Sequence, residues 1–285
     1  VRDQYAALLA MCDHSLGRVL DVMDELDLWR DTLLIVCTDH GYLLGEHGWW
    51  AKMVQPWYDE IIHTPLFIWD PRCEARGVGR EALVQTIDFG PTILDYFGLP
   101  PTPDMEGRPL ASTVANDTPI RKGALFGAFG GHVCVTDGRY VYMRAPKDAS
   151  NAPLYQHTLM PTHMRWRFSP EEIENAELHP PFPFTKNAPL LRMPGLDIGR
   201  ASAFDFGTLL FDLAGDPHQQ RPLINDGLEL AMIELMLELM RRNDAPPSQF
   251  DRLGLPRTGN ADRSHLLAKA QAQRSGATER SRHTA

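Results

Sequence analysis

The stretch LLIVCTDHGYLLGEHGWWAK, residues 33–52, joins an apolar run to a group of polar side chains. Residues 33–37 form a short continuous apolar run bounded by polar residues, which is typical of a strand buried on both faces of a parallel sheet. Asp39 and His40 follow almost directly. Ligands of open α/β sheets bind beyond the carboxyl ends of the strands, so this order predicts a ligand site at Asp39 and His40.

The residue types in this stretch suit a cation and an anion. Asp39 offers a carboxylate oxygen and His40 an imidazole nitrogen, and both are ligands of divalent cations. Two ligands are too few for a metal site, so further ligands must come from elsewhere. Lys52 can place one ammonium charge on an anionic oxygen. Spacing alone leaves a structural alternative open, in which the Asp-His pair caps a helix and Lys52 is a solvated end.

The flanking segments indicate an α/β fold. Apolar residues recur with helical period between Tyr5 and Trp29, so a helix precedes the strand. A second strand is expected within residues 64–71. Residues 84–101 predict a short strand, a turn and a helix with Pro91 near its first turn. A helix followed by a buried strand favours a layered α/β architecture.

The C-terminal half shows different patterns. Alternating apolar residues around Asp137-Gly138 predict a β-hairpin. Residues 147–200 hold many prolines and no sustained period, which predicts a long irregular excursion. A clear helix begins near Asn225 and is followed by a polar segment, residues 257–285, that we expect to be mobile.

These patterns predict three parts. Residues 1–125 are expected to form part of an α/β catalytic domain, and residues 126–256 a subdomain with the hairpin, the excursion and the terminal helix. Residues 257–285 form the expected mobile tail.

Composition limits the possible functions. The net charge of -9 and the pI near 5.6 leave no basic field for nucleic acid or an anionic membrane. No apolar run approaches the ~18 residues that span a bilayer, and no signal-like segment opens the chain. The compartment stays open, with the cytoplasm weakly favoured. The four cysteines are widely spaced without a CxxC pair, so we expect no disulfide framework and a buried thiol at Cys37.

Several motifs resemble one family. LLIVCTDHGYLLGEHGWWAKMVQPWYDEIIHTPLFIW is similar to the C-terminal metal-and-anion segment of the formylglycine-dependent (type I) sulfatases of the alkaline phosphatase superfamily, especially iduronate-2-sulfatase-like members. The resemblance continues through DFGPTILDYFGLPPTPDMEGRPL, VTDGRYVYM and LLFDLAGDPHQQ. It implies an alkaline-phosphatase-like sandwich with a mixed sheet flanked by helices, here the C-terminal portion with a small antiparallel C-terminal subdomain.

The resemblance also implies roles for the site residues. Asp39 and His40 would be metal ligands, and Lys52 would bind a sulfate oxygen near the leaving group. The family metal is usually Ca2+, whereas a nitrogen ligand makes Mn2+ or Zn2+ more plausible. The implied reaction is hydrolysis of a sulfuric ester in a sulfated small molecule or carbohydrate. A phosphonate or phosphodiester hydrolase of the same superfamily is the alternative.

Parts of the family pattern are missing from the sequence. The nucleophile motif, Cys/Ser-x-Pro-x-Arg with its residue oxidised to formylglycine, does not occur at any cysteine or serine. The Asp-Asp metal pair and the Lys-x-His segment are also missing. We therefore expect a C-terminal portion that is inactive alone, with formylglycine in a missing N-terminal part. A complementing N-terminal half or a non-catalytic remnant are the alternatives.

Other side chains are weaker candidates for binding substrate. His132 follows the Gly-rich stretch FGAFGG. His157, His163 and Arg165 lie on the expected excursion, where cationic groups suit sulfate or carboxylate on a sugar. As surface loop residues, all four need no function.

Overall fold

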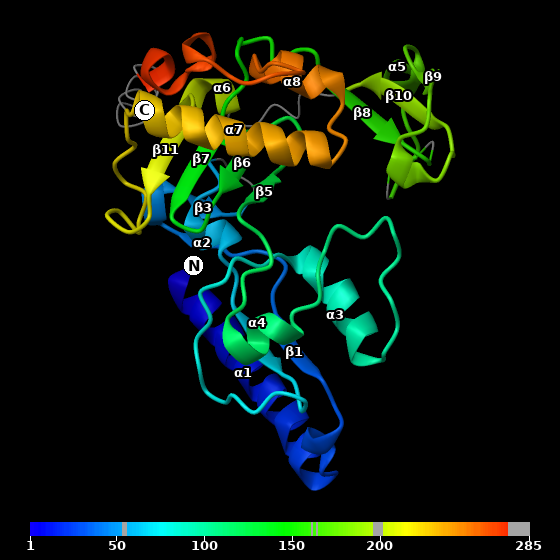
Figure 1. Cartoon of the computed structure of the whole chain (residues 1–285), viewed down its shortest axis with the longest axis vertical. Helices are drawn as coiled ribbons and strands as arrows, with labels where there is room; N and C mark the ends of the chain where they lie inside the picture. The colour runs from blue at the N-terminus through cyan, green and yellow to red at the C-terminus, as the bar shows by residue number, and fades with distance from the viewer. Residues whose placement is uncertain (53–55, 161, 164, 196–201, 273–285) are drawn as a thin grey trace. The chain divides into compact units, whose positions relative to one another are not determined.

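The computed structural model describes residues 1–52, 56–160, 162–163, 165–195 and 202–272 (Figure 1). The chain divides into two compact units. Unit 1 comprises Val1–Val54 and Asp59–Lys122, and unit 2 comprises Gln55–Tyr58 and Gly123–Ala285.

Unit 1 combines helices with short strands. Its described elements are α1 (Arg2–Glu25), η1 (Leu28–Arg30), β1 (Leu34–Cys37), β2 (Leu43–Leu44), η2 (Glu46–Gly48), β3 (Trp50–Ala51), α2 (Asp59–Ile62), β4 (Leu66–Trp69), η3 (Thr86–Asp88), α3 (Phe89–Tyr96) and α4 (Ala111–Asn116). The predicted long helix, the strand that follows it and the strand within residues 64–71 are confirmed as α1, β1 and β4.

The pairing of β1 differs from the prediction. β1 and β4 form a two-stranded antiparallel sheet, with Leu34 opposite Trp69 and Cys37 opposite Leu66. The side chains of β1 are half-buried, and Cys37 is exposed. A strand with one partner keeps an open edge, so the expected parallel, doubly buried strand and the buried thiol were wrong. All four cysteines are free.

The short strand expected at the start of residues 84–101 is also absent from this described segment. The Asp88 carboxylate accepts a hydrogen bond from the backbone N–H of Gln85 at 2.8 Å, which closes a capping turn before η3. The helix α3 follows, with Pro91 in its first turn. Asp88 is fully buried and also accepts from the backbone N–H of Arg108 at 2.9 Å and from the Arg121 guanidinium.

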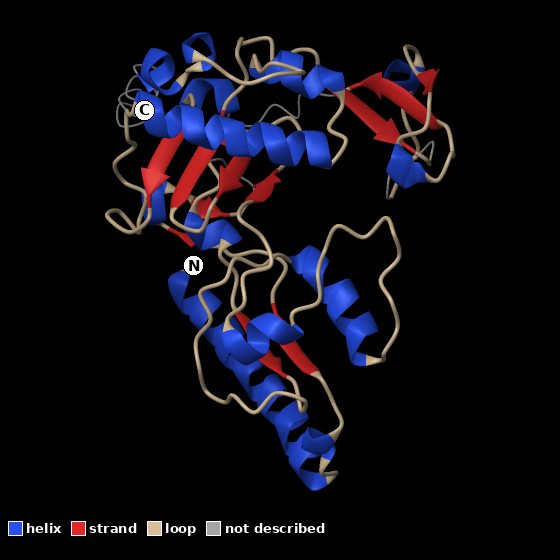
Figure 2. Ribbon diagram, in the orientation of Figure 1, coloured by secondary structure: helices blue, strands red, loops and turns tan. Residues whose placement is uncertain are grey.

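Unit 2 is built on antiparallel sheets. Its described elements are β5 (Ala124–Gly127), β6 (Val133–Thr136), β7 (Tyr140–Arg144), β8 (Tyr155–Thr158), α5 (Pro170–Ile173), β9 (Glu177–His179), η4 (Pro183–Thr185), β10 (Leu190–Pro194), α6 (Ala203–Phe206), β11 (Leu209–Asp212), α7 (Asp226–Arg242), α8 (Pro247–Leu253) and η5 (Arg263–His265). A four-stranded sheet has the order β11-β7-β6-β5. Helix α7 lies across one face of this sheet (Figure 2).

The predicted hairpin and helix are confirmed. β6 and β7 pair antiparallel, and the Asp137 carboxylate accepts from the backbone N–H of Arg139 and Tyr140 in the turn. Gly138 has φ +96°, the left-handed region that glycine tolerates best. Asn225 caps α7 by accepting from the backbone N–H of Leu228 at 3.0 Å.

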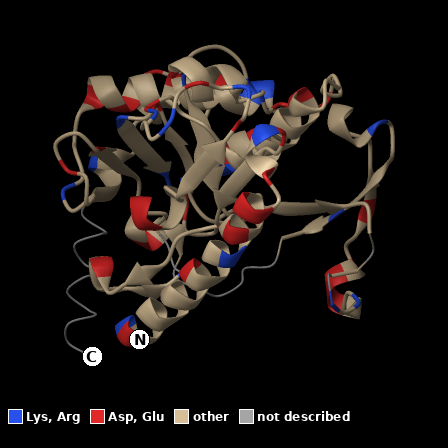
Figure 3. Cartoon of the chain, turned by 90° about the horizontal axis from the view of Figure 1, so that it is seen from below, with Lys and Arg blue, Asp and Glu red and all other residues tan. Residues whose placement is uncertain are grey.

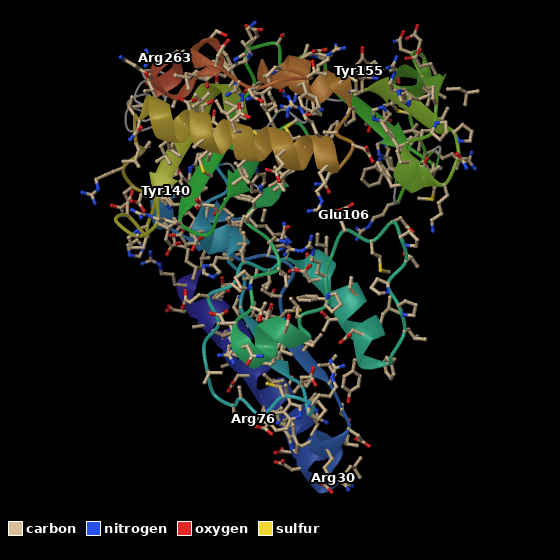
Figure 4. All side chains as sticks on the ribbon, in the orientation of Figure 1. Arg30, Arg76, Glu106, Tyr140, Tyr155 and Arg263 are labelled. Atoms are coloured by element: carbon tan, nitrogen blue, oxygen red, sulfur yellow. The ribbon has the colours of Figure 1, made fainter. Side chains whose placement is uncertain are left out.

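The excursion predicted to be irregular contains a small sheet. β8, β10 and β9 form a three-stranded antiparallel sheet, with Arg192 of β10 opposite His157 of β8 and Glu177 of β9. The Arg192 guanidinium lies over the ring of Tyr155, which is labelled in Figure 4. Cross-strand partners stabilise strands that are too short to show a period in the sequence.

The polar segment after residue 257 is packed as far as the structure describes it. Ala268 and Gln271 are buried. The Glu229 carboxylate of α7 accepts from the backbone N–H groups of Leu267 and Ala268 at 2.8 and 3.0 Å. The described part of this segment, residues 257–272, is thus held in place by these hydrogen bonds and by its buried side chains, in contrast to the expected mobile tail. The rest of the expected tail, residues 273–285, lies outside the described residues.

The described residues also bear on membrane crossing and on the distribution of charge. No helix among them combines the length and the apolar character that crossing a membrane requires. Figure 3 shows Lys and Arg residues interspersed with Asp and Glu residues.

Candidate functional site

Asp39, His40 and Lys52 come together at the carboxyl end of β1 in unit 1. The Nζ atom of Lys52 contacts Nε2 of His40. The Oδ2 atom of Asp39 lies 3.3 Å from the same Nε2 atom. The structure thus joins the three residues singled out from residues 33–52 into one cluster.

A close backbone approach fixes the loop that carries Asp39 and His40. The backbone N–H of Gly41 donates to the carbonyl oxygen of Ile61 in α2 at 2.7 Å. A Cβ atom at Gly41 would lie 1.8 Å from the carbonyl oxygen of Glu60. Only glycine fits here without a shift of the backbone, so α2 holds the loop in place.

The hairpin of β2 and β3 places Lys52 beside His40. Leu43, which is fully buried, pairs with Ala51, the residue before Lys52. Between the strands the chain turns at Gly45 and Gly48, whose φ angles are +111° and +73°. Gly45 and Gly48 therefore shape the turn that places Lys52.

The contacts of His40 assign its tautomer. The Nδ1 atom lies 2.9 Å from the carbonyl oxygen of Gly41. A carbonyl oxygen only accepts hydrogen bonds, so Nδ1 carries a proton and donates to it. Nε2 is the ring nitrogen that contacts Lys52 Nζ. Metal-binding histidines are commonly oriented in this way, by a bond from the other ring nitrogen to a backbone carbonyl.

Asp39 faces solvent and is ionised at neutral pH. Its side chain is 80% exposed. Desolvation acts to raise the pKa of Asp39, but the charge and backbone N–H of His40, together with the Lys52 ammonium, outweigh it and hold this pKa below its usual value. The carboxylate therefore adds negative charge beside His40 Nε2.

A partly buried pair joins the turn of the hairpin to α2. His47 Nε2 is 3.4 Å from Glu60 Oε2, and the His47 side chain is 8% exposed. Glu60 is also the residue whose carbonyl oxygen approaches Gly41. The pair links the turn of the hairpin to the helix that holds the Asp39 loop. Glu60 was missed in the sequence, where only its place before the apolar Ile61-Ile62 marks it.

The donor set fits part of a metal site. Asp39 Oδ2 and His40 Nε2 converge, and the cationic Nζ of Lys52 stands beside them. Among the residues that the structure describes, no group of three or more His, Cys, Asp and Glu side chains is placed to hold a metal ion. Asp39 and His40 therefore fit two positions of a coordination shell, and other atoms must supply the rest.

His132 in unit 2 is interior rather than superficial. Its side chain is fully buried, and Nε2 lies 2.9 Å from the carbonyl oxygen of Gly207. Burial lowers the pKa of His132 to about 4, so the ring is neutral at pH 7. This burial weighs against the predicted contact with substrate, because the ring would have to leave the core.

The other candidates lie on the excursion of unit 2 and are not gathered into one cluster. The ring of His157 packs against those of His179 and Phe182, with centroids 4.9 and 5.1 Å apart. His163 instead pairs with Glu172 through Nε2. Arg165 is exposed. Their role in binding substrate stays a prediction.

Comparison with known structures defines the class of fold. A protein solved in complex with its substrate D-glucosamine-2-N,6-O-disulfate superposes with a TM-score of 0.57 at 18% identity, covering 83% of this chain and 39% of that one. The phosphonate monoester hydrolase SpPMH from Silicibacter pomeroyi superposes with a TM-score of 0.52 at 23% identity, covering 81% and 39%. Unit 1 and unit 2 thus belong to an alkaline-phosphatase-like α/β fold.

Sequence comparison names the family within this class. The model of the sulfatase family matches residues 1–99. The chain is 33% identical over 130 residues to the N-acetylglucosamine-6-O-sulfatase of Bacteroides thetaiotaomicron, a match that covers 44% of this chain and 23% of that protein. Residues 1–99 thus match the sulfatase family, and the chain is similar in sequence to members of that family. It spans less than half the length of these relatives.

Proposed function

We propose that this chain forms part of a metal-dependent hydrolase of sulfuric esters. One observation carries the proposal: a carboxylate, an imidazole nitrogen and an ammonium meet at the end of β1, inside the segment that the sulfatase family model matches. Substrates of this kind are sulfated small molecules or carbohydrates. The named relative, an N-acetylglucosamine-6-O-sulfatase, supports a sulfated sugar.

The three residues have separate tasks in this proposal. Asp39 and His40 would hold the metal. Ca2+ is the usual metal of the family, whereas the nitrogen ligand favours Mn2+ or Zn2+. When bound, such a metal polarises an oxygen of the ester and neutralises developing charge. Lys52 would bind a nonbridging oxygen of the sulfate through the charge of its ammonium. Gly41 orients His40 through its carbonyl oxygen.

The nucleophile has to come from polypeptide outside residues 1–285. No Cys/Ser-x-Pro-x-Arg motif occurs in the sequence, so a formylglycine would reside elsewhere. We expect the chain by itself to have negligible activity.

An exposed apolar face on unit 1 supports a complementing polypeptide. The large apolar side chains exposed on α1, at its C-cap and on β4 include Leu8, Leu9, Met11, Val19, Val22, Leu26 and Phe67. So many exposed apolar side chains along one helix favour an interaction site on a folded protein. A polypeptide that completes the α/β layer would cover it and bring the missing catalytic groups.

A phosphonate or phosphodiester hydrolase is the second candidate. The likeness to a phosphonate monoester hydrolase and the nitrogen ligand at His40 favour it. The same three residues would act on phosphorus instead of sulfur, because Lys52 recognises charge and not the central atom.

One activity assay separates these proposals. The chain is purified alone and together with the polypeptide encoded directly upstream of Val1, and 4-nitrophenyl sulfate and 4-nitrophenyl phenylphosphonate are offered with Ca2+ or Mn2+. We expect turnover of the sulfate only with the added polypeptide, and a loss of about 100-fold in Lys52→Ala. Preferred turnover of the phosphonate would support the second candidate. Full activity in Lys52→Ala would contradict the assigned role of Lys52.

A further inference from the structure

We propose that the small sheet of β8, β10 and β9 in unit 2 opens in acid, because His157 and His179, which pack on its face, gain charge beside the fixed cation Arg192. The inference is independent of the proposed hydrolysis. It gives the excursion a pH-sensitive element, and His157 is also one of the residues predicted to bind substrate.

Three aromatic rings form a compact cluster on this sheet. The ring centroid of His157 lies 4.9 Å from that of His179 and 5.1 Å from that of Phe182. The rings of His179 and Phe182 are 5.2 Å apart. These distances are those of packed aromatic pairs. The three rings, called the ring cluster below, join β8 to β9 and to the segment that leads into η4.

The sheet depends on local packing. Its strands are only three to five residues long, and a sheet of this size needs a packed face to be stable. Neither of the two apolar clusters described in unit 2 includes a residue of these strands. Leu190 and Met193 of β10 add buried apolar side chains. Two titratable rings are therefore among the main contacts that hold the sheet together.

A fixed positive charge stands next to the ring cluster. Arg192 is the cross-strand partner of His157, and directly opposed residues of an antiparallel pair share one face. Arg192 Nε donates to Glu177 Oε1 at 2.7 Å, so the carboxylate of Glu177 already serves a cation. His163, on the same excursion, has the carboxylate of Glu172 as its own partner. In the described contacts, a charged His157 gains no such partner.

Burial lowers the pKa of His157, and the charges of His179 and Arg192 lower it further. The opened chain therefore binds more protons than the folded sheet between this lowered pKa and the ordinary value near 6.5. The stability of the sheet is complete above pH 6.5 and falls as the pH drops below it. Geometry and charge thus act in the same direction.

The surrounding elements carry other groups that titrate or are charged. They are Tyr155 on β8, Glu177 and His179 on β9, Arg192 on β10, Glu171 and Glu172 on α5, and Lys186 at the C-cap of η4. Tyrosine, lysine and arginine do not titrate between pH 7 and 5, and glutamate stays mostly ionised in this range. A change between these two pH values therefore reports on the histidines.

The test is hydrogen-exchange mass spectrometry of the full chain at pH 7 and pH 5, corrected for the intrinsic exchange rate. Protection of β8, β9 and β10 should fall about fivefold relative to that of β6 and β7. This is less than the tenfold of one pKa unit, because both histidine rings are partly exposed. The strands β6 and β7 serve as the internal reference, because they report the effect of acid on the core around His132.

Ring variants separate charge from packing. His157→Phe and His179→Phe each keep a ring and remove a titration, so each should reduce the relative fall to about twofold. His163→Gln is the matched control, because it removes a histidine of the same excursion that has a carboxylate partner. It should keep the fivefold fall. Either phenylalanine variant suffices if the other does not fold.

Nuclear magnetic resonance of the histidine ring protons gives a second readout. His157 should titrate below pH 6.5, and its pKa should rise toward 6.5 in Arg192→Gln, because the opposing charge is removed. An unchanged titration of His157 in Arg192→Gln would reject the role of Arg192.

Two results of the exchange experiment would overturn the proposal. The first is an equal loss of protection in the small sheet and in β6 and β7, which would assign the effect of acid to the core of unit 2. The second is an undiminished relative fall in both His157→Phe and His179→Phe, which would show that the charge of the ring cluster does not open the sheet.

Discussion

Helix α7 of unit 2 turns its apolar side chains inward, whereas the longer helix α1 of unit 1 leaves many of its apolar side chains exposed. Leu237 of α7 is 0% exposed and Leu9 of α1 is 60% exposed, although both are leucines on helices. α7 has a four-stranded sheet to cover, but the sheet of β1 and β4 is only two strands wide. Helix α7 packs against β5, β6 and β7 and thereby buries apolar surface of the kind that α1 leaves exposed.

Each unit also buries a charged side chain that hydrogen-bonds to other parts of the chain. In unit 2, Arg144 is buried inside the apolar core and donates to the hydroxyl of Tyr142, which donates in turn to Glu229. In unit 1, the buried carboxylate of Asp88 joins three separate segments of chain. Among the described residues, the two clusters of buried apolar side chains lie in unit 2, whereas the candidate site lies in unit 1.

The largest effect should come from the leucine pair. Leu237→Ala should lower the free energy of unfolding by about 2–5 kcal/mol, because it leaves a cavity in the core of unit 2. Leu9→Ala should change it by less than about 0.5 kcal/mol. Urea unfolding with hydrogen-exchange mass spectrometry measures both units. A similar loss in both variants would show that the face of α1 is covered in solution.

The pH dependence of unit 2 should follow His132. Its pKa is about 4 in the folded chain and near 6.5 when unfolded, so the unfolded state binds more protons between these values. Stability of unit 2 should therefore fall as the pH drops from about 6.5 to about 4, by up to about 3 kcal/mol. The urea midpoint at each pH measures this, with His132→Gln as the control. An unchanged slope in His132→Gln would contradict the assignment.

The glycine at the site should respond more strongly than a glycine on α1. Gly41→Ala should cost about 1–3 kcal/mol, because its Cβ meets the Glu60 carbonyl oxygen. Gly17→Ala, where nothing lies within 4 Å of the added Cβ, should stabilise α1 by about 0.5–1 kcal/mol. Thermal unfolding and hydrogen-exchange protection of β1 and α2 distinguish the two variants. Faster hydrogen exchange at α2 in Gly17→Ala, but not in Gly41→Ala, would contradict this prediction.

The smallest effect concerns the start of α7. Asn225→Ala removes the side chain that accepts from the N–H of Leu228, and should cost about 1 kcal/mol. Asn225→Asp keeps an accepting oxygen at the helix N-terminus and should cost less. Chemical denaturation measures both. A larger loss in Asn225→Asp would show that capping is not what holds this end of α7.

Local signals in the sequence predicted much of the fold. α1, β1, the hairpin at Asp137-Gly138 and α7 each have a period, a turn or a cap that acts within a few residues. The sheet of β8, β9 and β10 and the packed residues 257–272 have no such signal. Their order depends on Arg192 meeting Glu177 and on Glu229 meeting Leu267, which are distant in the chain.

The site divides in the same way. Asp39, His40 and Lys52 could be chosen from residues 33–52, because chemistry and nearness to a strand end are visible in the sequence. The burial of His132 and the Glu60–His47 pair could not. Both depend on segments brought together by folding.

The sequence alone therefore determined the class of fold, the family resemblance and the three residues of the candidate site, because periodicity, turns and side-chain chemistry are local properties. Only the tertiary structure decided that β1 pairs antiparallel with β4, that Gly41 must approach Glu60, and that Lys52 Nζ contacts Nε2 of His40. These are distances between segments, and they are set by the packing of the whole unit rather than by any stretch of the chain.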